Sequence, residues 1–307
     1  MSTMGPTVTE VADLATMPTV LGGLFVEQAH HPHVRMRERS LTRSDWLPEP
    51  DGILVAELAA DELPDRTGEV EQRLRDDGIA KVRLDRLLTN DELVTFGRRL
   101  GTVMVHETSP KLQHQVDDGL VFNLRRERTD VTSDYALALI SSNELTLHAE
   151  VCVRPVQRQP RYIALHCVEP SPPDTGGQTV FVPMTAVHDR LTRTQAEMLQ
   201  HAHFSQFPES PPFLSWRGGR PVFSFRDFGD DLLWWRYVGP RGSLTAGELN
   251  ETLVRLLESM YDPDLMTGVS WRRAELLVWD NWRFFHGRTR IQETDTEARH
   301  FKNIKIN

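Results

Sequence analysis

The sequence predicts an α+β protein built around a double-layered antiparallel barrel. Three observations indicate this fold class: helical patterns at the front of the chain, short extended segments through its middle and end, and a helical insertion between those segments. No stretch has the composition of an interdomain linker, so residues 1–307 are expected to form a single domain.

The front of the chain is expected to pack around this barrel. Residues 1–50 are rich in Pro, His and Arg and only weakly periodic, which predicts an irregular N-terminal arm. A short helix is predicted over residues 66–78, because two apolar residues lie four apart and Gly78 can end it. Residues 79–84 alternate in pattern and predict the first strand of the core, which is expected to span about 79–307.

Three Thr-x-x-Glu patterns predict capping boxes at helix starts, at Thr89, Thr194 and Thr245. The helix after Thr245 has a regular apolar stripe. Short extended segments separated by turn residues fill residues 103–183. Two further strands are predicted at the end of the chain, in the segments ELLVWDNWRFFHGR and ARHFKNIKI.

Composition narrows the class of partner. The net charge is −9 and there is no basic run, which argues against nucleic acid and anionic membranes as partners. The N-terminus has no signal-peptide pattern, and no apolar run approaches a membrane span. Two cysteines, Cys152 and Cys167, do not make a disulfide scaffold. We therefore expect a cytoplasmic protein with a small-molecule ligand; the sequence does not specify its oligomeric state.

Two histidines and one glutamate are the most informative residues for function. His148 and Glu150 form a His-x-Glu pair in LTLHAEVC, and His286 lies far along the chain in WDNWRFFHGR. Alternate residues of a strand share a face, so the pair would project to one side. Two histidines and one carboxylate are the ligands of a non-haem iron site, although zinc accepts the same donor types. Taken alone, His148 and His286 fit equally well as ordinary polar residues at strand ends. By chance, about 1.7 histidines in a chain of this composition would have an acidic residue two positions later.

Two further residues are candidates for binding an anion. Thr179 follows a Gly-Gly turn in DTGGQTVFVP, although that turn is explained equally well by a simple hairpin. Arg299 shares a face of the last predicted strand with Phe301 and Asn303. An inward arginine needs an anionic partner, and a carboxylate suits the guanidinium best. The alternative is an outward, solvated Arg299, with the intervening residues facing inward.

Taken as an ordered set, these features resemble the taurine dioxygenase family of Fe(II)/2-oxoglutarate oxygenases. The resemblance runs from about Ile79 to Asn307 and includes FGRRLGTV, HAE, GGQT, WDNWRFFHGR and the closing arginine strand. It implies a double-stranded β-helix, a cupin-like jelly roll with flanking helices. The glutamate in place of the commoner aspartate resembles the clavaminate synthase-like branch.

The resemblance also implies roles for single residues. The family's Fe(II) ligands correspond to His148, Glu150 and His286. Its threonine and arginine that bind 2-oxoglutarate correspond to Thr179 and Arg299. Many relatives carry a second arginine four residues after the first, where this chain has Asn303, so a free α-carboxylate on the substrate is less assured.

The implied activity is that of a single-domain oxygenase. It would use O2 and 2-oxoglutarate to hydroxylate an unactivated C–H bond of a small molecule, such as an amino-acid-derived or specialised metabolite, and release succinate and CO2. Desaturation or ring closure would use the same residues. Glu150 disfavours halogenation, because related halogenases leave the carboxylate position open for halide.

The substrate pocket is the least specified part of the sequence. Residues 204–240 are dense in aromatic, Pro, Gly and charged residues and predict an insertion or lid, in which Trp234 and Trp235 are expected to serve packing. Candidate substrate contacts are the residues Asn303, Arg125, Arg126, Arg226, Asp230 and Asp231.

Two alternatives belong to other classes of protein. A zinc hydrolase could use the same three ligands with a bound water, but it has no evident use for Arg299. A barrel that binds a small molecule without chemistry is the other alternative. Metal content together with 2-oxoglutarate consumption would separate all three.

Overall fold

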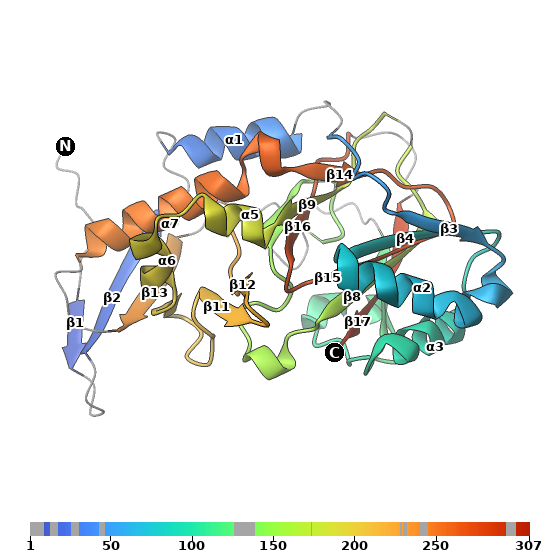
Figure 1. Cartoon of the computed structure of the whole chain (residues 1–307), viewed down its shortest axis with the longest axis horizontal. Helices are drawn as coiled ribbons and strands as arrows, with labels where there is room; N and C mark the ends of the chain where they lie inside the picture. Colours follow the sequence, from blue (N-terminus) through green and yellow to red (C-terminus); the bar gives the residue numbers. More distant parts are fainter. Residues whose placement is uncertain are drawn as a thin grey trace. The chain divides into compact units, whose positions relative to one another are not determined.

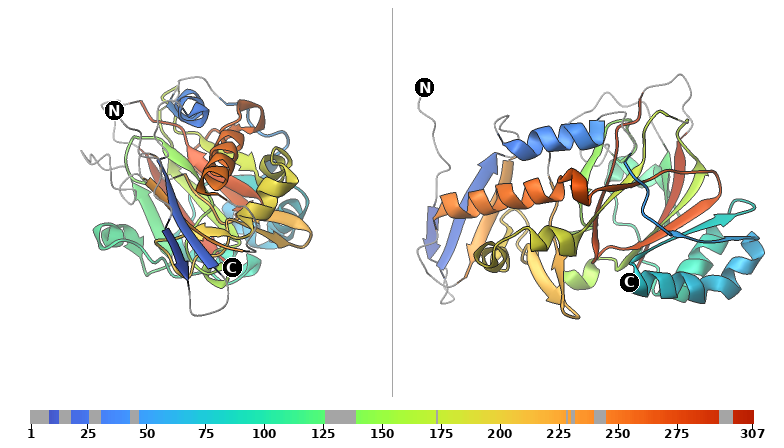
Figure 2. Two further views of the ribbon diagram at one scale, coloured as in Figure 1. Left: turned by 90° about the vertical axis from the view of Figure 1, so that its left-hand side faces the viewer. Right: turned by 45° about the horizontal axis from the view of Figure 1, so that its top comes forward.

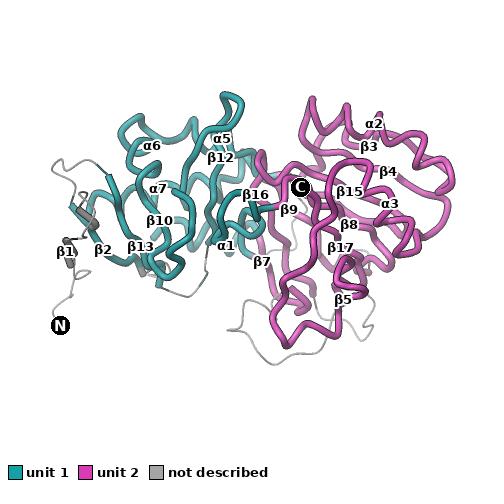
Figure 3. Tube along the Cα trace, turned by 90° about the horizontal axis from the view of Figure 1, so that it is seen from below, with its two compact units in different colours: residues 1–40, 146–159, 182–266 teal, residues 41–145, 160–181, 267–307 magenta. Residues whose placement is uncertain are grey.

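The computed structural model describes most of the chain. The described residues are 9–12, 18–25, 31–42, 47–125, 139–172, 174–227, 229, 232–239, 245–292 and 299–307. Their internal packing divides the chain into two compact units (Figure 3). The first unit contains residues 1–40, 146–159 and 182–266, and the second contains residues 41–145, 160–181 and 267–307.

The second unit contains a seven-stranded sheet with the order β3-β4-β15-β8-β17-β6-β5 (Figure 1). Its strands are β3 (Leu54–Leu58), β4 (Ile79–Leu84), β5 (Val116–Asp117), β6 (Val121–Arg125), β8 (Tyr162–Glu169), β15 (Glu275–Asp280) and β17 (His300–Ile306). β3 pairs with β4 in parallel, and the other five pairs are antiparallel. Strands from distant parts of the chain pair directly in this sheet: β4 pairs with β15, and β17 pairs with both β6 and β8.

Two helices cover one face of this sheet (Figure 1). They are α2 (Leu63–Asp76) and α3 (Asn90–Leu100). The predicted capping box of α3 is confirmed: the hydroxyl of Thr89 accepts from the backbone N–H of Glu92, whose carboxylate accepts from the backbone N–H of Thr89. α2 begins earlier than its predicted start, because a proline in its first turn favours helix initiation there.

The two faces of the sheet bury different side chains. Along β8, Tyr162 and Ala164 pack with the helices, whereas Ile163, Leu165 and Cys167 belong to a second apolar cluster. Side chains that alternate in this way point to opposite faces of a strand. All six residues of β15 are buried, so both faces of the sheet centre are covered.

A four-stranded sheet has the order β14-β9-β16-β7. Its strands are β7 (Leu145–His148), β9 (Thr179–Pro183), β14 (Thr267–Val269) and β16 (Phe284–Arg288). The histidines and the threonine singled out in the sequence lie on these strands: His148 ends β7, Thr179 begins β9 and His286 lies inside β16.

The first unit contains another four-stranded sheet, with the order β1-β2-β13-β10, and a separate hairpin. The sheet strands are β1 (Thr9–Ala12), β2 (Pro18–Phe25), β10 (Ala202–Phe204) and β13 (Leu232–Val238). The hairpin consists of β11 (Leu214–Arg217) and β12 (Arg220–Phe223).

In the part of the chain that the structure describes, four α-helices accompany these strands. They are α1 (Pro32–Thr42), α5 (Met184–Asp189), α6 (Arg193–Leu199) and α7 (Ala246–Met260). Figure 2 shows the long α7 running beside β2, and its Asn250 side chain donates to the Gly23 carbonyl and accepts from the Trp235 indole. Short 3₁₀ helices lie at Ala60–Glu62, Pro110–Gln115, Val156–Arg158 and Pro263–Leu265.

The N-terminal region differs from the predicted irregular arm. Its described residues form β1, β2 and α1. β2 pairs with β13 from Thr19 opposite Val238 to Phe25 opposite Leu232. Because the hydrogen-bond partners lie so far away in the sequence, local periodicity could not reveal this strand.

The predicted helix start at Thr194 is wrong. α6 begins two residues earlier, with Thr192 as its N-cap, and the capping box is formed with Gln195. Thr192-x-x-Gln195 satisfies the same pattern, because the glutamine side chain accepts from the N-cap backbone as a glutamate would. Within the described residues, no helix is long and apolar enough to cross a bilayer.

Candidate functional site

The end of β7 fixes the orientation of His148. Its Nδ1 lies 2.8 Å from the carbonyl oxygen of Thr146, which can only accept a hydrogen bond. Nδ1 therefore carries the ring hydrogen, and Nε2 keeps its lone pair for a metal. The side chain is buried, and its Nε2 lies 3.6 Å from Oε2 of Glu150. The strand thus presents this imidazole in the tautomer that a metal ligand needs.

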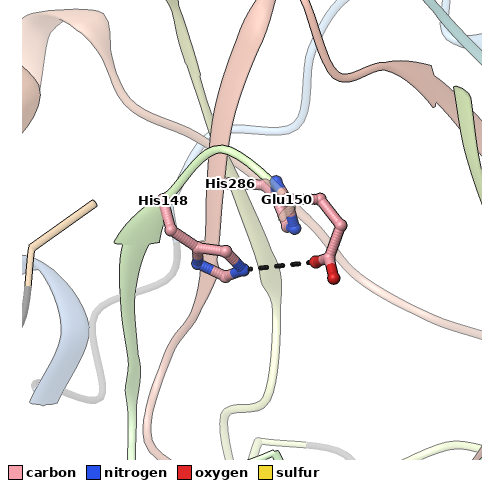
Figure 4. Close-up of side chains that lie close together, drawn as sticks. All are labelled: His148, Glu150 and His286. Carbon is pink, nitrogen blue, oxygen red and sulfur yellow. Dashed lines mark ion pairs between the residues drawn. The ribbon is translucent and has the colours of Figure 1, made fainter. Parts of the chain in front are cut away.

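Glu150 lies in a turn rather than in the strand. β7 ends at His148, the backbone N–H of Ala149 donates to Phe225, and Val151 has a left-handed φ of 57°. The carboxylate nevertheless points toward His148 (Figure 4). Glu150 therefore reaches His148 because of the geometry of this turn, and not because alternate residues of a strand share a face, as the sequence suggested.

The predicted strand ELLVWDNWRFFHGR is in fact two strands with a turn between them. β15 ends at Asp280, whose carboxylate accepts from the backbone N–H of Trp282 and whose carbonyl accepts from that of Arg283. Asp and Asn favour such turns because their side chains bond the backbone two residues on. His286 therefore lies in β16, where its ring packs 5.0 Å from the ring of Trp279.

The structure brings His148, Glu150 and His286 together (Figure 4). One potential ligand atom from each residue, an imidazole nitrogen or a carboxylate oxygen, lies within 4.8 Å of the other two. Bonds of about 2.0–2.2 Å to one ion require donor atoms roughly 3 Å apart, so small side-chain rotations close the set. Two nitrogens and one oxygen suit Fe(II) and leave coordination positions open. The donor set therefore fits the predicted metal.

A buried carboxylate that the sequence did not single out supports the end of β7, where His148 lies. Asp227 accepts hydrogen bonds from Arg37, at 3.1 Å, and from the hydroxyl of Tyr261, at 2.7 Å. Its own backbone N–H donates to Leu147, and its carbonyl accepts from the hydroxyl of Thr146. These bonds hold the two residues that precede His148.

Burial and Asp227 together determine the protonation of Tyr261. Burial, and next to it the Asp227 charge, holds the pKa of this phenol well above its ordinary value. The phenol therefore keeps its hydrogen and donates it to Asp227, while its oxygen accepts from the backbone N–H of Leu147 at 3.1 Å. No spacing pattern connects Arg37, Asp227 and Tyr261, so sequence reasoning had no signal for them.

Thr179 begins β9 and is buried. The two preceding glycines make the tight turn that the sequence predicted: Gly176 has φ 88° and Gly177 has φ 81°. The hydroxyl oxygen of Thr179 accepts a 3.0 Å hydrogen bond from the indole N–H of Trp271. This contact was not foreseen from the sequence.

Arg299 faces inward, as the first of the two sequence alternatives expected. Its guanidinium lies 4.5 Å from the centre of the Phe301 ring, and only 6% of the residue is exposed. Burial, and next to it the nearby charge of Arg288, lowers the pKa of Arg299 well below its ordinary value. Within the part of the chain that the structure describes, no carboxylate pairs with it. A buried cation of this kind needs an anionic partner to compensate its charge.

The candidate substrate residues lie in three different settings. Asn303 is buried in the sheet, where its amide donates to the carbonyl of Ala164 at 3.3 Å. Arg125 is exposed at the end of β6, with its Nε 3.4 Å from the His300 ring. Arg226 forms an isolated backbone bridge with His148. Arg126, Asp230 and Asp231 lie outside the described residues.

Neither cysteine has the properties of a reactive thiol. Both are free and buried. Burial raises the pKa of Cys152 to about 12 and keeps that of Cys167 high as well. A thiol held in its neutral form is a poor nucleophile and a poor metal ligand, so Cys152 serves as a small apolar residue near Glu150.

Comparison with known proteins gives one family match and many similar structures. The family model described as "Taurine catabolism dioxygenase TauD, TfdA family" matches residues 39–304. The PvcB protein from Pseudomonas aeruginosa has a TM-score of 0.60 and 18% identity, with 86% of this chain and 90% of that chain covered. Among curated proteins, none matches the sequence.

Two further solved structures are similar over nearly the same extent. A taurine dioxygenase from Burkholderia xenovorans has a TM-score of 0.57 and 17% identity, covering 86% of this chain and 91% of that chain. An asparagine oxygenase, solved with Fe(II), 2S,3S-3-hydroxyasparagine and succinate, has a TM-score of 0.57 and 14% identity, covering 91% and 92%. At these identities the similarity shows a shared fold of mixed sheets and helices.

Proposed function

Because the chain belongs to the TauD, TfdA family of dioxygenases, we propose that it hydroxylates an unactivated C–H bond of a small molecule. The family model covers residues 39–304 of the 307-residue chain, which includes every candidate ligand. The observation that carries the proposal is the convergence of His148, Glu150 and His286. Three donors of this kind are the ligand set expected for non-haem iron.

Family membership confirms the predicted resemblance and the predicted enzyme class. Fe(II) and 2-oxoglutarate are the cofactor and cosubstrate of this class, and the His-Glu-His set fits the metal. The zinc-hydrolase and non-catalytic alternatives are therefore set aside. When bound, iron supplies the redox chemistry that couples oxidation of the substrate to conversion of 2-oxoglutarate and O2 into succinate and CO2.

The protein residues hold and orient the reacting groups. His148 and His286 would each give an imidazole nitrogen, and Glu150 a carboxylate oxygen. The contact of His148 with the Thr146 carbonyl keeps the coordinating nitrogen free of hydrogen. Both histidines are buried, which limits the access of water to their ring nitrogens.

Arg299 and Thr179 are proposed to bind the far carboxylate of 2-oxoglutarate. The support is that Arg299 is buried and that no described carboxylate neutralises it. A dicarboxylate would supply that charge through two parallel hydrogen bonds to the guanidinium. The buried hydroxyl of Thr179 is proposed to donate a further hydrogen bond to the same carboxylate.

The substrate is proposed to be derived from an amino acid. Two similar structures hold hydroxylated amino acids. The asparagine oxygenase holds 3-hydroxyasparagine, and the non-haem iron oxygenase OrfP, which has a TM-score of 0.56 and 17% identity, holds (3S)-hydroxy-L-Arg. Asn303 offers no charge for a substrate carboxylate, and its amide is already bonded to the sheet. Arg226, beside His148, is the better candidate for that contact. Desaturation or cyclisation would use the same iron and cosubstrate residues.

The organisation of the chain is also part of the proposal. We infer that residues 1–307 form a single oxygenase domain, because the family match includes residues of both compact units. The seven-stranded sheet and the sheet β14-β9-β16-β7 are proposed to form the double-stranded β-helix, or jelly roll. Residues 204–240, which contain β11, β12 and β13, are proposed as the insertion that closes over the substrate.

Anaerobic titration with Fe(II) and then 2-oxoglutarate tests this function. The chelate should give a weak visible charge-transfer band in the wild-type protein. Arg299→Met should need at least about 10-fold more 2-oxoglutarate for the same band, because an ionic bidentate contact is lost. The variant should unfold in urea at the same or a higher concentration than wild type, since it removes an uncompensated buried charge. Folded, iron-loaded wild type without a band would refute the proposal.

A further inference from the structure

Trp271 contacts Thr179, and it also packs against Phe301, the aromatic ring over which the Arg299 guanidinium lies. Its indole N–H donates to the Thr179 hydroxyl oxygen at 3.0 Å. Its ring meets the Phe301 ring edge to face, with centroids 4.8 Å apart and planes at 72°. The Arg299 guanidinium lies 4.5 Å from the centre of that same Phe301 ring. A single indole therefore connects the hydroxyl and the cation.

The hydrogen bond from Trp271 leaves the hydroxyl hydrogen of Thr179 available for a different acceptor. An indole nitrogen is a donor only, so the Thr179 oxygen is the acceptor in this contact. Its own hydrogen remains available for another acceptor. Among the described residues none accepts it, although the residue is only 4% exposed. A buried hydroxyl normally donates its hydrogen, so this geometry calls for an acceptor that is not part of the described chain.

The adjacent charge identifies the chemical class of that acceptor. Arg299 is buried and unmatched by any described carboxylate, and Arg288 adds a second positive charge nearby. A carboxylate satisfies both requirements, because it accepts from a hydroxyl and from a guanidinium together. A neutral acceptor would leave the cation uncompensated.

We propose that Trp271 is a positioning residue for 2-oxoglutarate: it directs the Thr179 hydroxyl toward the far carboxylate and, through Phe301, supports the guanidinium of Arg299. This inference rests on the proposed function, which assigns Thr179 and Arg299 to that carboxylate. A hydroxyl that accepts one hydrogen bond donates a stronger one, so the indole acts on affinity without touching the ligand.

The test uses Mn(II)-loaded protein and 2-oxoglutarate in a calorimetric titration, which measures binding without turnover. Trp271→Phe keeps an aromatic ring against Phe301 and removes the N–H donor together with one ring of the indole, a loss of ring size that the Trp216→Phe control shares. It should weaken 2-oxoglutarate binding by about 3- to 10-fold, the effect of one hydrogen bond. Its Mn(II) affinity should remain that of wild type. Trp216→Phe is the matched control, because Trp216 is 49% exposed on β11.

A double-mutant cycle separates positioning from general loosening of the fold. If Trp271 acts through the hydroxyl, Trp271→Phe should cause no further loss in a Thr179→Val background. Multiplied losses in the double variant, or unchanged binding by Trp271→Phe alone, would overturn the inference. Wild type that binds Mn(II) but not 2-oxoglutarate would overturn the proposed function and this inference with it.

Discussion

The hydroxyl of Tyr261 donates to Oδ2 of Asp227 across 2.7 Å and accepts from the backbone N–H of Leu147. The phenol thus joins a buried carboxylate to the residue just before His148. Arg37 binds the same carboxylate oxygen from α1. The end of β7, which carries the first proposed metal ligand, is therefore held by groups from three distant parts of the sequence.

Asp227→Asn should lower both stability and metal affinity. The substitution removes the buried ion pair between Arg37 and the Asp227 carboxylate, which should lower the free energy of unfolding by about 3–5 kcal/mol. The end of β7 loses its fixed position, and Fe(II) affinity should fall roughly 10- to 100-fold, as for other groups that orient metal ligands. Urea unfolding and anaerobic Fe(II) titration measure the two effects.

Leu253→Ala is the control for destabilisation alone. Leu253 is fully buried on α7, and its truncation should cost a comparable 2–5 kcal/mol or so. It should leave Fe(II) affinity unchanged in the folded protein. If Asp227→Asn binds Fe(II) as tightly as Leu253→Ala does, the carboxylate has only a structural role.

Glu150→Ala should remove the metal-dependent stabilisation of the protein. A ligand that binds only the folded state at 100 times its Kd adds about 2.7 kcal/mol. Loss of one of the three donors should weaken binding by more than about 100-fold, and so abolish most of that gain. Thermal unfolding with Fe(II) or a chelator checks this. Glu197→Ala, exposed on α6, should keep the full metal response; a full response in Glu150→Ala would exclude this carboxylate as a ligand.

The sequence was sufficient to single out the three proposed metal ligands, because their pattern is local or ordered. His148 and Glu150 are two residues apart, and the Gly-Gly turn before Thr179 is a short signal of its own. These residues can be recognised from their types and their spacing in the sequence. The geometry behind it was less predictable, since Glu150 reaches His148 from a turn at Val151.

Features that depend on contacts between distant residues were not predictable. β2 is a strand because β13 supplies its hydrogen bonds, and Asp227 is a supporting residue because Arg37 and Tyr261 surround it. Neither relationship leaves a periodic trace in one sequence. The capping box at Thr192 was missed for a different reason, because two overlapping patterns compete there.

Stability should fall as the pH is lowered from about 6.5 to 4, in part through His166. Burial lowers the pKa of this histidine from 6.5 to about 4, and its Nε2 accepts from the backbone N–H of Leu88. Between these pH values the unfolded chain binds the proton and the folded chain does not, so acid favours unfolding. The full effect is about 3 kcal/mol, of which roughly 2 kcal/mol is lost at pH 5.

Urea unfolding at pH 7 and pH 5 measures this dependence. His166→Gln can still accept from Leu88 but does not titrate, so its stability should decline less between the two pH values. Burial also lowers the pKa of His300 to about 4, so some acid sensitivity should remain in the variant. An equal decline in wild type and His166→Gln would show that His166 does not contribute.

Gly176→Ala should be far more damaging than Gly218→Ala, although both glycines have left-handed backbones. Their φ angles are 88° and 55°, so each alanine bears a conformational cost of about 1–2 kcal/mol. A Cβ on Gly218 meets nothing within 4 Å, whereas one on Gly176 would overlap the carbonyl oxygen of Arg290. The backbone before Thr179 must then shift.

The difference between these two variants isolates the effect of that overlap. Gly176→Ala should lose at least about 2 kcal/mol more than Gly218→Ala in urea unfolding, because a backbone oxygen cannot rotate away. It should also bind 2-oxoglutarate more weakly, since the turn that places the Thr179 hydroxyl is displaced, while Gly218→Ala should bind as wild type does. Equal stability and equal binding in the two variants would mean that the turn relaxes around the methyl group, and that the position of Thr179 does not depend on it.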